Sequence, residues 1–115
     1  MRSFEIRTRS AIPVKIGTLS FDETRQTWSI DLDIDAAISG NHGLLTEAAE
    51  NGTAHLDHEL AVLWVRSRIA PPSRQNINDI LANAGLDHYD EVDFIAATRG
   101  ETHRDDLCIR EVRGI

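Results

Sequence analysis

The sequence predicts an α+β protein, and three observations support that fold class. Three runs within the first 35 residues alternate apolar and polar side chains with the period of a β-strand. The most apolar run of the chain begins at Leu60 and stops at a double proline, Pro71-Pro72. Beyond it, two short segments place apolar residues at helical spacing. We therefore expect an N-terminal three-stranded antiparallel β-meander in residues 1–55, packed on a C-terminal three-helix unit in residues 56–115, with one shared core.

The first two predicted strands cover residues 3–9 and 14–21, where apolar and polar residues alternate. Gly17 interrupts the second run and marks a β-bulge, because an isolated glycine inside a strand often does. Short polar turns join consecutive runs, which is typical of an antiparallel meander. The side chains expected to face the core are Phe4, Ile6, Val14, Ile16 and either Thr18 or Leu19.

The third predicted strand, residues 28–35, has the most regular alternation in the chain. Its core-facing residues are Trp28, Ile30, Leu32 and Ile34. Asp31, Asp33 and Asp35 then project together from the opposite face, about 6.6–7 Å apart along the strand. This spacing approximates that of successive phosphates on a nucleic-acid strand. The alternative interpretation is an ordinary solvated sheet face.

Residues 36–55 are expected to form a loop with one helical turn at residues 44–49. A helix over residues 56–68 follows, with acidic residues in its first turn and arginines in its last, as the helix dipole favours. Because its apolar residues cover more than one face, we expect this helix to be buried on several sides. Pro71-Pro72 ends it, and Ser73 is a candidate N-cap for the next helix.

Two shorter helices and a final strand complete the prediction. An apolar stripe over residues 77–84 predicts the second helix. A Ser/Thr-x-x-acid pattern at residues 102–105 has the form of a capping box. Residues 107–112 predict a short closing strand that could return to the sheet edge. The residues expected to bound these helices are Gly85 after the second, Asp87 or Asp90 before the third, and Gly100 after the third.

The net charge of this 115-residue chain is −7, and it is unevenly distributed. Residues 17–63 hold nine acidic residues and one arginine, a net charge of −8, whereas residues 1–16 and 64–78 each sum to +3. An acidic chain is repelled by phosphate backbones, so we expect no direct nucleic-acid binding. The expected partner is instead a protein with a basic surface. The alternative is that the acidity only keeps the domain soluble.

We expect a cytoplasmic protein that is not embedded in a membrane. Cys108 is the single cysteine, so no internal disulfide can form, which favours a reducing compartment. No apolar run approaches the ~20 residues of a membrane span. The first seven residues contain no apolar signal core. A monomer is the expected oligomeric state.

No catalytic constellation is evident, and we expect no enzyme, no metal and no cofactor. His103-Arg104-Asp105 imitates the catalytic loop of protein kinases, but the Asn that should follow and the metal-binding Asp-Phe-Gly are missing. His55 and His58 lie at i, i+3, a spacing at which two histidines on a helix face could share a metal. Solvated residues at a helix start are the simpler interpretation of that pair.

Residues 60–109 contain motif residues in a recognisable order. A tryptophan-bearing helix runs into an arginine and an Ile-(x)-Pro-x-Ser-Arg type of turn, a second helix ends in Leu-Gly, and a Gly-x-Thr-x-x-Asp segment follows. The residues concerned are Leu60, Trp64, Arg68, Ile69, Pro72, Ser73, Arg74, Leu81, Gly85, Leu86, Gly100, Thr102, Asp105 and Ile109. This order resembles the accessory module that precedes the kinase domain in bacterial HipA-like kinase proteins. The resemblance implies a prokaryotic module, often borne on mobile elements, that works by contacts and carries no catalytic residue.

The sequence therefore predicts a small acidic bacterial or phage protein that acts by protein–protein contact. The sharpest version is an inhibitor of a host nucleic-acid-binding defence complex, of the anti-CRISPR or anti-restriction type, that acts by DNA mimicry. The alternative is a detached accessory domain that binds or regulates a HipA-like kinase in a toxin–antitoxin system. The residues expected to form the partner-binding surface are Asp22, Glu23, Asp31, Asp33, Asp35, Asp87, Asp90, Glu91 and Asp93.

Overall fold

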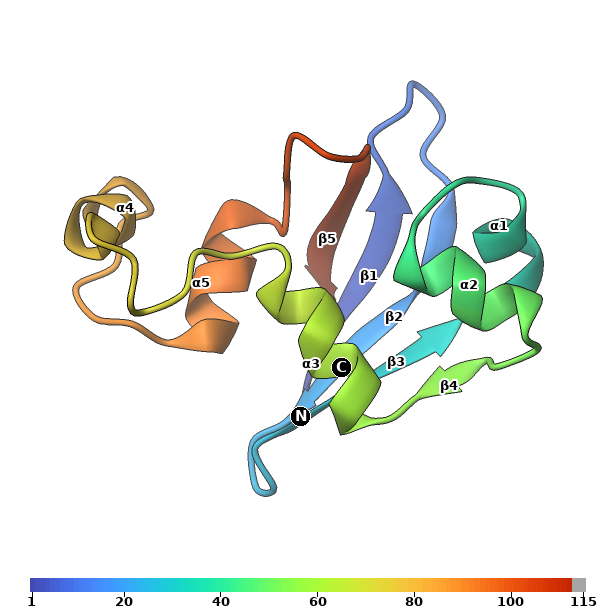
Figure 1. The fold of residues 1–115 in the computed structure, drawn as a ribbon, viewed down its shortest axis with the longest axis horizontal. Helices are drawn as coiled ribbons and strands as arrows, with labels where there is room; N and C mark the ends of the chain where they lie inside the picture. Colours follow the sequence, from blue (N-terminus) through green and yellow to red (C-terminus); the bar gives the residue numbers. More distant parts are fainter. Residues whose placement is uncertain (113–115) are drawn as a thin grey trace.

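The computed structural model describes residues 1–112, which form one antiparallel sheet of five strands and five helices (Figure 1). The strand order is β4-β3-β2-β1-β5, so β4 and β5 lie at opposite edges of the sheet. The strands are β1 (Arg2–Thr8), β2 (Lys15–Asp22), β3 (Thr27–Leu32), β4 (His55–Leu56) and β5 (Leu107–Val112). The helices are α1 (Ile34–Ile38), α2 (Leu44–Glu50), α3 (His58–Arg66), α4 (Ile77–Asn83) and α5 (Glu91–Thr98).

One hydrophobic core lies between a face of the sheet and helices α1, α2, α3 and α5. Its side chains with at most 1% exposure include Phe4, Ile6, Trp28 and Ile30 from the strands and Ala37, Leu45, Val65 and Ile95 from the helices. Helix α4 buries Leu81 alone and lies at the periphery of the molecule (Figure 1). The side chains that alternate with the core residues along β1 to β3 are mostly polar and partly exposed.

The predicted α+β class is confirmed, but a unit of three strands and three helices is not what residues 1–112 form. The predicted meander is present as β1, β2 and β3, and the closing strand pairs with β1 as β5, from Ser3 opposite Val112 to Thr8 opposite Leu107. Helix α1 and strand β4 are additional elements, and the predicted boundary between residues 55 and 56 falls inside β4. A two-residue strand leaves no periodic pattern in the sequence, so pattern alone could not indicate β4.

The bulge predicted at Gly17 is present. Ile6 lies opposite Gly17 while the next residue, Arg7, lies opposite Lys15, so Ile16 is the extra residue of β2. A Cβ atom on Gly17 would lie 2.5 Å from the backbone oxygen of Asp31 on β3, which explains why only glycine fits. The bulge also shifts, by one residue, which side chains of β2 face the core. The inward residues are therefore Ile16 and Leu19, not Thr18, and the expected burial of Val14 is wrong because its side chain is 45% exposed.

The third strand is shorter than predicted, because β3 ends at Leu32 and the chain turns into α1. Asp33 is the N-cap of this helix, and its carboxylate accepts a hydrogen bond from the Ala36 N–H at 3.2 Å. The Asp33 N–H donates to the Ile16 oxygen at 2.8 Å, which fixes the turn against β2. Ile34 therefore begins a helix instead of continuing the strand, although it still packs against the core.

Helix α3 is the predicted central helix, and the Asp57 carboxylate caps it by accepting from the Leu60 N–H. It buries one face, not several. Trp64 and Val65 are buried, whereas Leu60 and Leu63 are 39% and 60% exposed, so the expectation of burial on several sides is wrong.

The remaining helix boundaries agree only in part with the predicted capping residues. Asn76, not Ser73, occupies the N-cap position of α4. Gly85 follows α4 with φ of +79°, and Asp90 caps α5 by accepting from the Asp93 N–H at 2.9 Å. The capping box predicted at residues 102–105 is wrong, because no helix begins there.

Candidate functional site

The nine acidic residues predicted to form a surface separate into two groups at opposite ends of β3. Asp22 and Glu23 lie at the β2–β3 turn, before β3 begins. Asp31 lies near the other end of β3, and Asp33 and Asp35 follow it in the cap and first turn of α1. The structure brings the first group together with the start of α5, where a shallow pocket is lined by Glu23, Asp90 and Asp93 around Arg2.

The carboxylates at the start of α5 are largely neutralised by neighbouring cations. Arg2 donates from Nη1 to Asp93 at 3.0 Å and from Nε to Glu111 at 2.8 Å, and these bonds hold its pKa above the usual range. The N-terminal amine lies 3.5 Å from Glu23. This end of the molecule therefore offers less negative charge than its composition suggests.

Three further carboxylates of this group stabilise the local fold. Asp22 accepts from the Thr24 and Arg25 N–H groups and closes the hairpin turn. Glu91 accepts from the Trp28 indole N–H at 2.7 Å and from Arg66 Nε at 3.0 Å. Asp90 is the α5 cap described above. Asp87 pairs with the exposed His88 at 2.6 Å, which lowers the pKa of Asp87 and raises that of His88.

Asp31, Asp33 and Asp35 do not form the predicted ladder on one strand face. Only Asp31 lies on β3, and its Oδ1 is 2.7 Å from His55 Nδ1 on β4. Asp33 is a helix cap and Asp35 is a helical residue, because the strand stops at Leu32. The regular spacing of about 6.6–7 Å expected for residues on one strand therefore does not apply to this trio.

A larger acidic surface includes the same three residues. Residues 26–65 contain seven carboxylates and no lysine or arginine. They lie on β3, at the β4 edge, on α1 and α2, and at the start of α3, and all seven are exposed. We call this surface the acidic edge; its residues are Asp31, Asp33, Asp35, Glu47, Glu50, Asp57 and Glu59.

Four members of the acidic edge were missed as site candidates: Glu47, Glu50, Asp57 and Glu59. The signal that could have found them is the net charge of −8 over residues 17–63, together with the 40-residue stretch that lacks lysine and arginine. Alternation along a strand cannot indicate these four residues, because they lie on α2 and at the start of α3.

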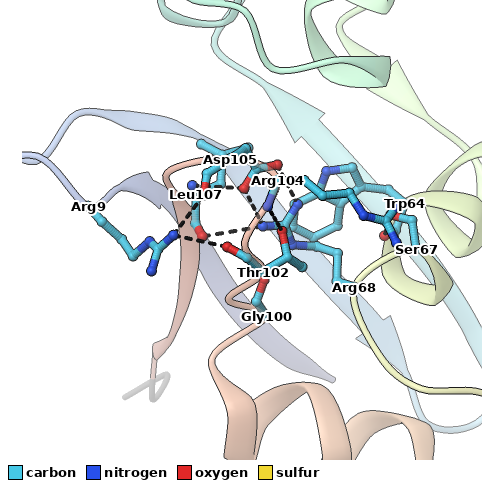
Figure 2. A network of polar contacts seen from close by, with 9 residues as sticks. All are labelled: Arg9, Trp64, Ser67, Arg68, Gly100, Thr102, Arg104, Asp105 and Leu107. Atoms are coloured by element: carbon cyan, nitrogen blue, oxygen red, sulfur yellow. Dashed lines mark hydrogen bonds and ion pairs between the residues drawn. The ribbon is translucent and has the colours of Figure 1, made fainter.

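A cluster of polar contacts surrounds Arg68, just after α3 (Figure 2). Its side chain is 4% exposed and forms two hydrogen bonds to the Asp105 carboxylate, at 2.7 and 2.9 Å. Its Nε donates to the Gly100 oxygen at 2.5 Å, and its guanidinium lies 4.7 Å from the centre of the Trp64 ring. Arg9 donates to the Thr102 and Asp105 backbone oxygens from the other side. The cluster fastens the segment before β5 to the end of α3.

Asp105 has a structural role in this cluster. The hydrogen bonds from Arg68 hold the pKa of its carboxyl below the ordinary value, with partial burial opposing the shift. Both of its carboxylate oxygens are occupied by Arg68, and Oδ1 also accepts from the Leu107 N–H. The kinase-like order of residues 103–105 is thus accounted for by an ion pair that stabilises the fold.

A pocket of about 520 Å³ adjoins the Arg68 cluster, between the α2 start and the α3 end. Leu44, Leu63 and Trp64 supply its apolar wall, and Arg68, Arg104 and Asp105 supply charged groups. His42 also lines it, and its Nδ1 is a buried atom without a hydrogen-bond partner among residues 1–112. The one lining carboxylate, that of Asp105, is already held by Arg68.

The two histidines considered for a metal do not share a helix face. His55 lies on β4 beside Asp31, and His58 begins α3, where its Nδ1 accepts from the Trp28 N–H at 2.9 Å. Among the described residues, no three His, Cys, Asp or Glu side chains are grouped closely enough to hold a metal ion. Within the same range, no helix is long and apolar enough to cross a membrane.

Comparison with known proteins found no matching family model, no matching curated protein and no matching solved structure. The resemblance to the accessory module of HipA-like kinase proteins therefore stays a prediction that rests on the motif residues alone.

Proposed function

We propose that the protein is a non-enzymatic binding protein whose acidic edge docks on a basic surface of a partner protein. One observation carries this proposal: seven exposed carboxylates lie on β3, α1, α2 and the start of α3, and residues 26–65 contain no lysine or arginine. Such a surface attracts cationic surfaces over a distance of about 10 Å at moderate salt and raises the association rate. It equally repels other anionic surfaces, which gives specificity.

Within this class, the partner that fits best is a nucleic-acid-binding defence complex of the CRISPR or restriction type. Proteins that hold DNA present arginine and lysine to its phosphates, and an exposed acidic edge is complementary to such a surface. The carboxylates come from several elements, so any mimicry of DNA would rest on their overall charge distribution and not on a regular ladder along one strand.

A second candidate is the accessory domain of a HipA-like kinase. The observation that favours it is that several residues of the resemblance meet in one place: Trp64, Arg68, Gly100 and Asp105 all belong to the Arg68 cluster. A motif whose members contact one another is consistent with a shared structural module.

The experiment that tests the proposal compares two variants of equal net charge. The edge variant carries Asp31→Asn, Asp35→Asn, Glu47→Gln and Glu50→Gln, and leaves the caps Asp33 and Asp57 intact. The control variant neutralises four exposed acids elsewhere on the chain: Asp79→Asn, Asp87→Asn, Glu101→Gln and Asp106→Asn. Partners are captured from a bacterial lysate on the immobilised wild-type protein and each variant, then identified by mass spectrometry.

We expect the wild type and the control variant to retain the same basic partner and the edge variant to lose it. Capture by the wild type should also decline as salt is raised, because the interacting charges are exposed. Equal capture by the edge variant would contradict the proposal. Capture of a kinase by all three proteins would favour the accessory-domain candidate instead.

A further inference from the structure

A second pocket, of about 490 Å³, lies at the sheet edge opposite the acidic edge, beside β1, β5 and the end of α5. Four of its lining residues are arginines: Arg7 from β1, Arg9 from the following loop, Arg99 from the end of α5, and Arg110 from β5. Four arginines lining one pocket are unexpected in a chain with a net charge of −7. Like charges at this density repel one another unless an anion lies between them.

The protein itself supplies few partners to these arginines, although Arg9 donates to the Thr102 and Asp105 backbone oxygens. Glu111 is the one carboxylate among the lining residues, and Arg2 already holds it through two hydrogen bonds of 2.8 Å. Arg7 reaches Glu5 only at 4.0 Å, the limit for an ion pair. Among the described residues, no side chain forms an ion pair or hydrogen bond with the guanidinium of Arg99 or Arg110.

The backbone at Arg99 is unusual for a non-glycine residue. Its φ is +57°, in the left-handed region that favours glycine, and it lies at the C-cap of α5. A non-glycine residue in this conformation costs about 1 kcal/mol or more, although helices often end with a residue in this region. The Ile109 N–H donates to the Arg99 oxygen at 2.8 Å, which holds the residue in place beside β5. A favourable interaction with the helix dipole could explain one arginine here. It does not explain the three that come from β1, its following loop and β5.

From these observations we propose that this pocket binds the phosphate group of a small phosphorylated molecule. Guanidinium groups match phosphate oxygens with paired N–H donors, and a phosphomonoester carries close to two negative charges at neutral pH. The pocket is larger than a phosphate ion and falls in the size range of small-ligand sites, so it has room for the rest of a compact ligand. A long nucleic acid is the poorer fit, because the chain as a whole has a net charge of −7 and repels an extended polyanion.

The test is an NMR titration of the full-length protein with inorganic phosphate, followed through backbone amide and arginine Nε–H signals. We expect shifts confined to residues 7–10 and 99–111, with a Kd on the order of 1 mM. Phenyl phosphate should bind more tightly, because its ring occupies further pocket volume. The pocket also contains the single cysteine, Cys108, so its alkylation by iodoacetamide should slow when phosphate is bound.

Two variants and two controls separate binding from folding. Arg99→Gly should keep or raise the thermal midpoint, since glycine favours a positive φ, yet weaken phosphate binding roughly 10- to 100-fold. Arg110→Gln should weaken binding by a similar factor. Gln26→Gly relieves the same backbone conformation, φ of +56°, in the β2–β3 turn, and should leave binding unchanged. Arg25→Gln removes an exposed arginine outside the pocket and should also leave binding unchanged.

The pH dependence adds a control for the ligand. Phenyl phosphate binding should weaken between pH 7.5 and pH 5.5, because the dianion of a phosphomonoester is protonated with a pKa of about 6. Sulfate keeps its charge over that range and should not show the change. Unchanged phosphate binding by Arg99→Gly, or shifts spread over all arginines, would overturn the proposal. Tight, strongly salt-dependent binding of single-stranded DNA at the same residues would overturn the assignment to a small ligand.

Discussion

Arg68 is an arginine with a side chain that is almost fully buried, and its position depends on residues far away in the sequence. Its carboxylate partner, Asp105, is 37 residues distant, and its backbone acceptors follow α5. The sequence predicted only that Arg68 would favour the helix dipole at the end of α3. The ion pair could not be predicted because it depends on how the segment after α5 returns to β5. A buried charge that loses its partner is strongly destabilising, so the cluster should be sensitive to single substitutions.

Replacing Asp105 by Asn should lower the free energy of unfolding by about 3 kcal/mol, because Arg68 would remain buried without a counter-charge. The measurement is equilibrium unfolding in urea. Asp106→Asn is the matched control, since Asp106 is exposed and its side chain makes no described contact; its effect should stay within about 0.5 kcal/mol. Similar values for the two variants would show that Arg68 does not need the carboxylate.

The stability that Asp105 contributes should depend on pH in a defined direction. Its pKa in the folded protein lies below the ordinary 3.8, so the contribution is present above that pH and is lost as pH falls through the folded value. The difference in unfolding free energy between wild type and Asp105→Asn should therefore be constant above about pH 5 and shrink below pH 3.8. A difference that stays constant down to pH 2 would contradict the pairing.

At the scale of elements, the change from β3 to α1 shows that the alternation of apolar and polar residues extends further than the strand itself. Residues 28–32 alternate and form a strand, as predicted. The same alternation continues to Asp35, but Asp33 can cap a helix, and its N–H is bound by the Ile16 oxygen. The Leu32 N–H in turn bonds the Ala54 oxygen, a contact that forms only when β4 returns to the sheet edge. Long-range hydrogen bonds thus decided a boundary that local periodicity left ambiguous.

If Asp33 acts as the N-cap of α1, then Asp33→Ala should destabilise the protein by about 1 kcal/mol, within the range of about 0.5–2 kcal/mol for lost caps. Asp33→Asn should be nearly neutral, because an asparagine side chain can accept the same hydrogen bond. Asp35→Ala removes a neighbouring exposed carboxylate and is the control. The check is the urea midpoint of each variant. Equal effects of the Ala and Asn substitutions would argue against the cap.

At the scale of the whole molecule, charge is segregated between the two edges of the sheet. The acidic edge lies at β4, α1 and α2. The four-arginine pocket lies at β5, which is the opposite edge strand of the sheet. Net charge and its uneven distribution were visible in the sequence. The arrangement of that charge was not, because strand order sets which segments share an edge. The opposite polarity of the edges suits a protein that meets different ligands at each.

The measurement that tests the acidic edge most directly is hydrogen–deuterium exchange of the protein, alone and bound to its captured partner. Binding through the acidic edge should slow amide exchange in β4, α1, α2 and the start of α3, residues 31–59, and leave α4 and α5 unchanged. The edge variant should show no such protection at the same partner concentration. Protection confined to α4, α5 or the β5 pocket, with the region of residues 31–59 unaffected, would contradict the account.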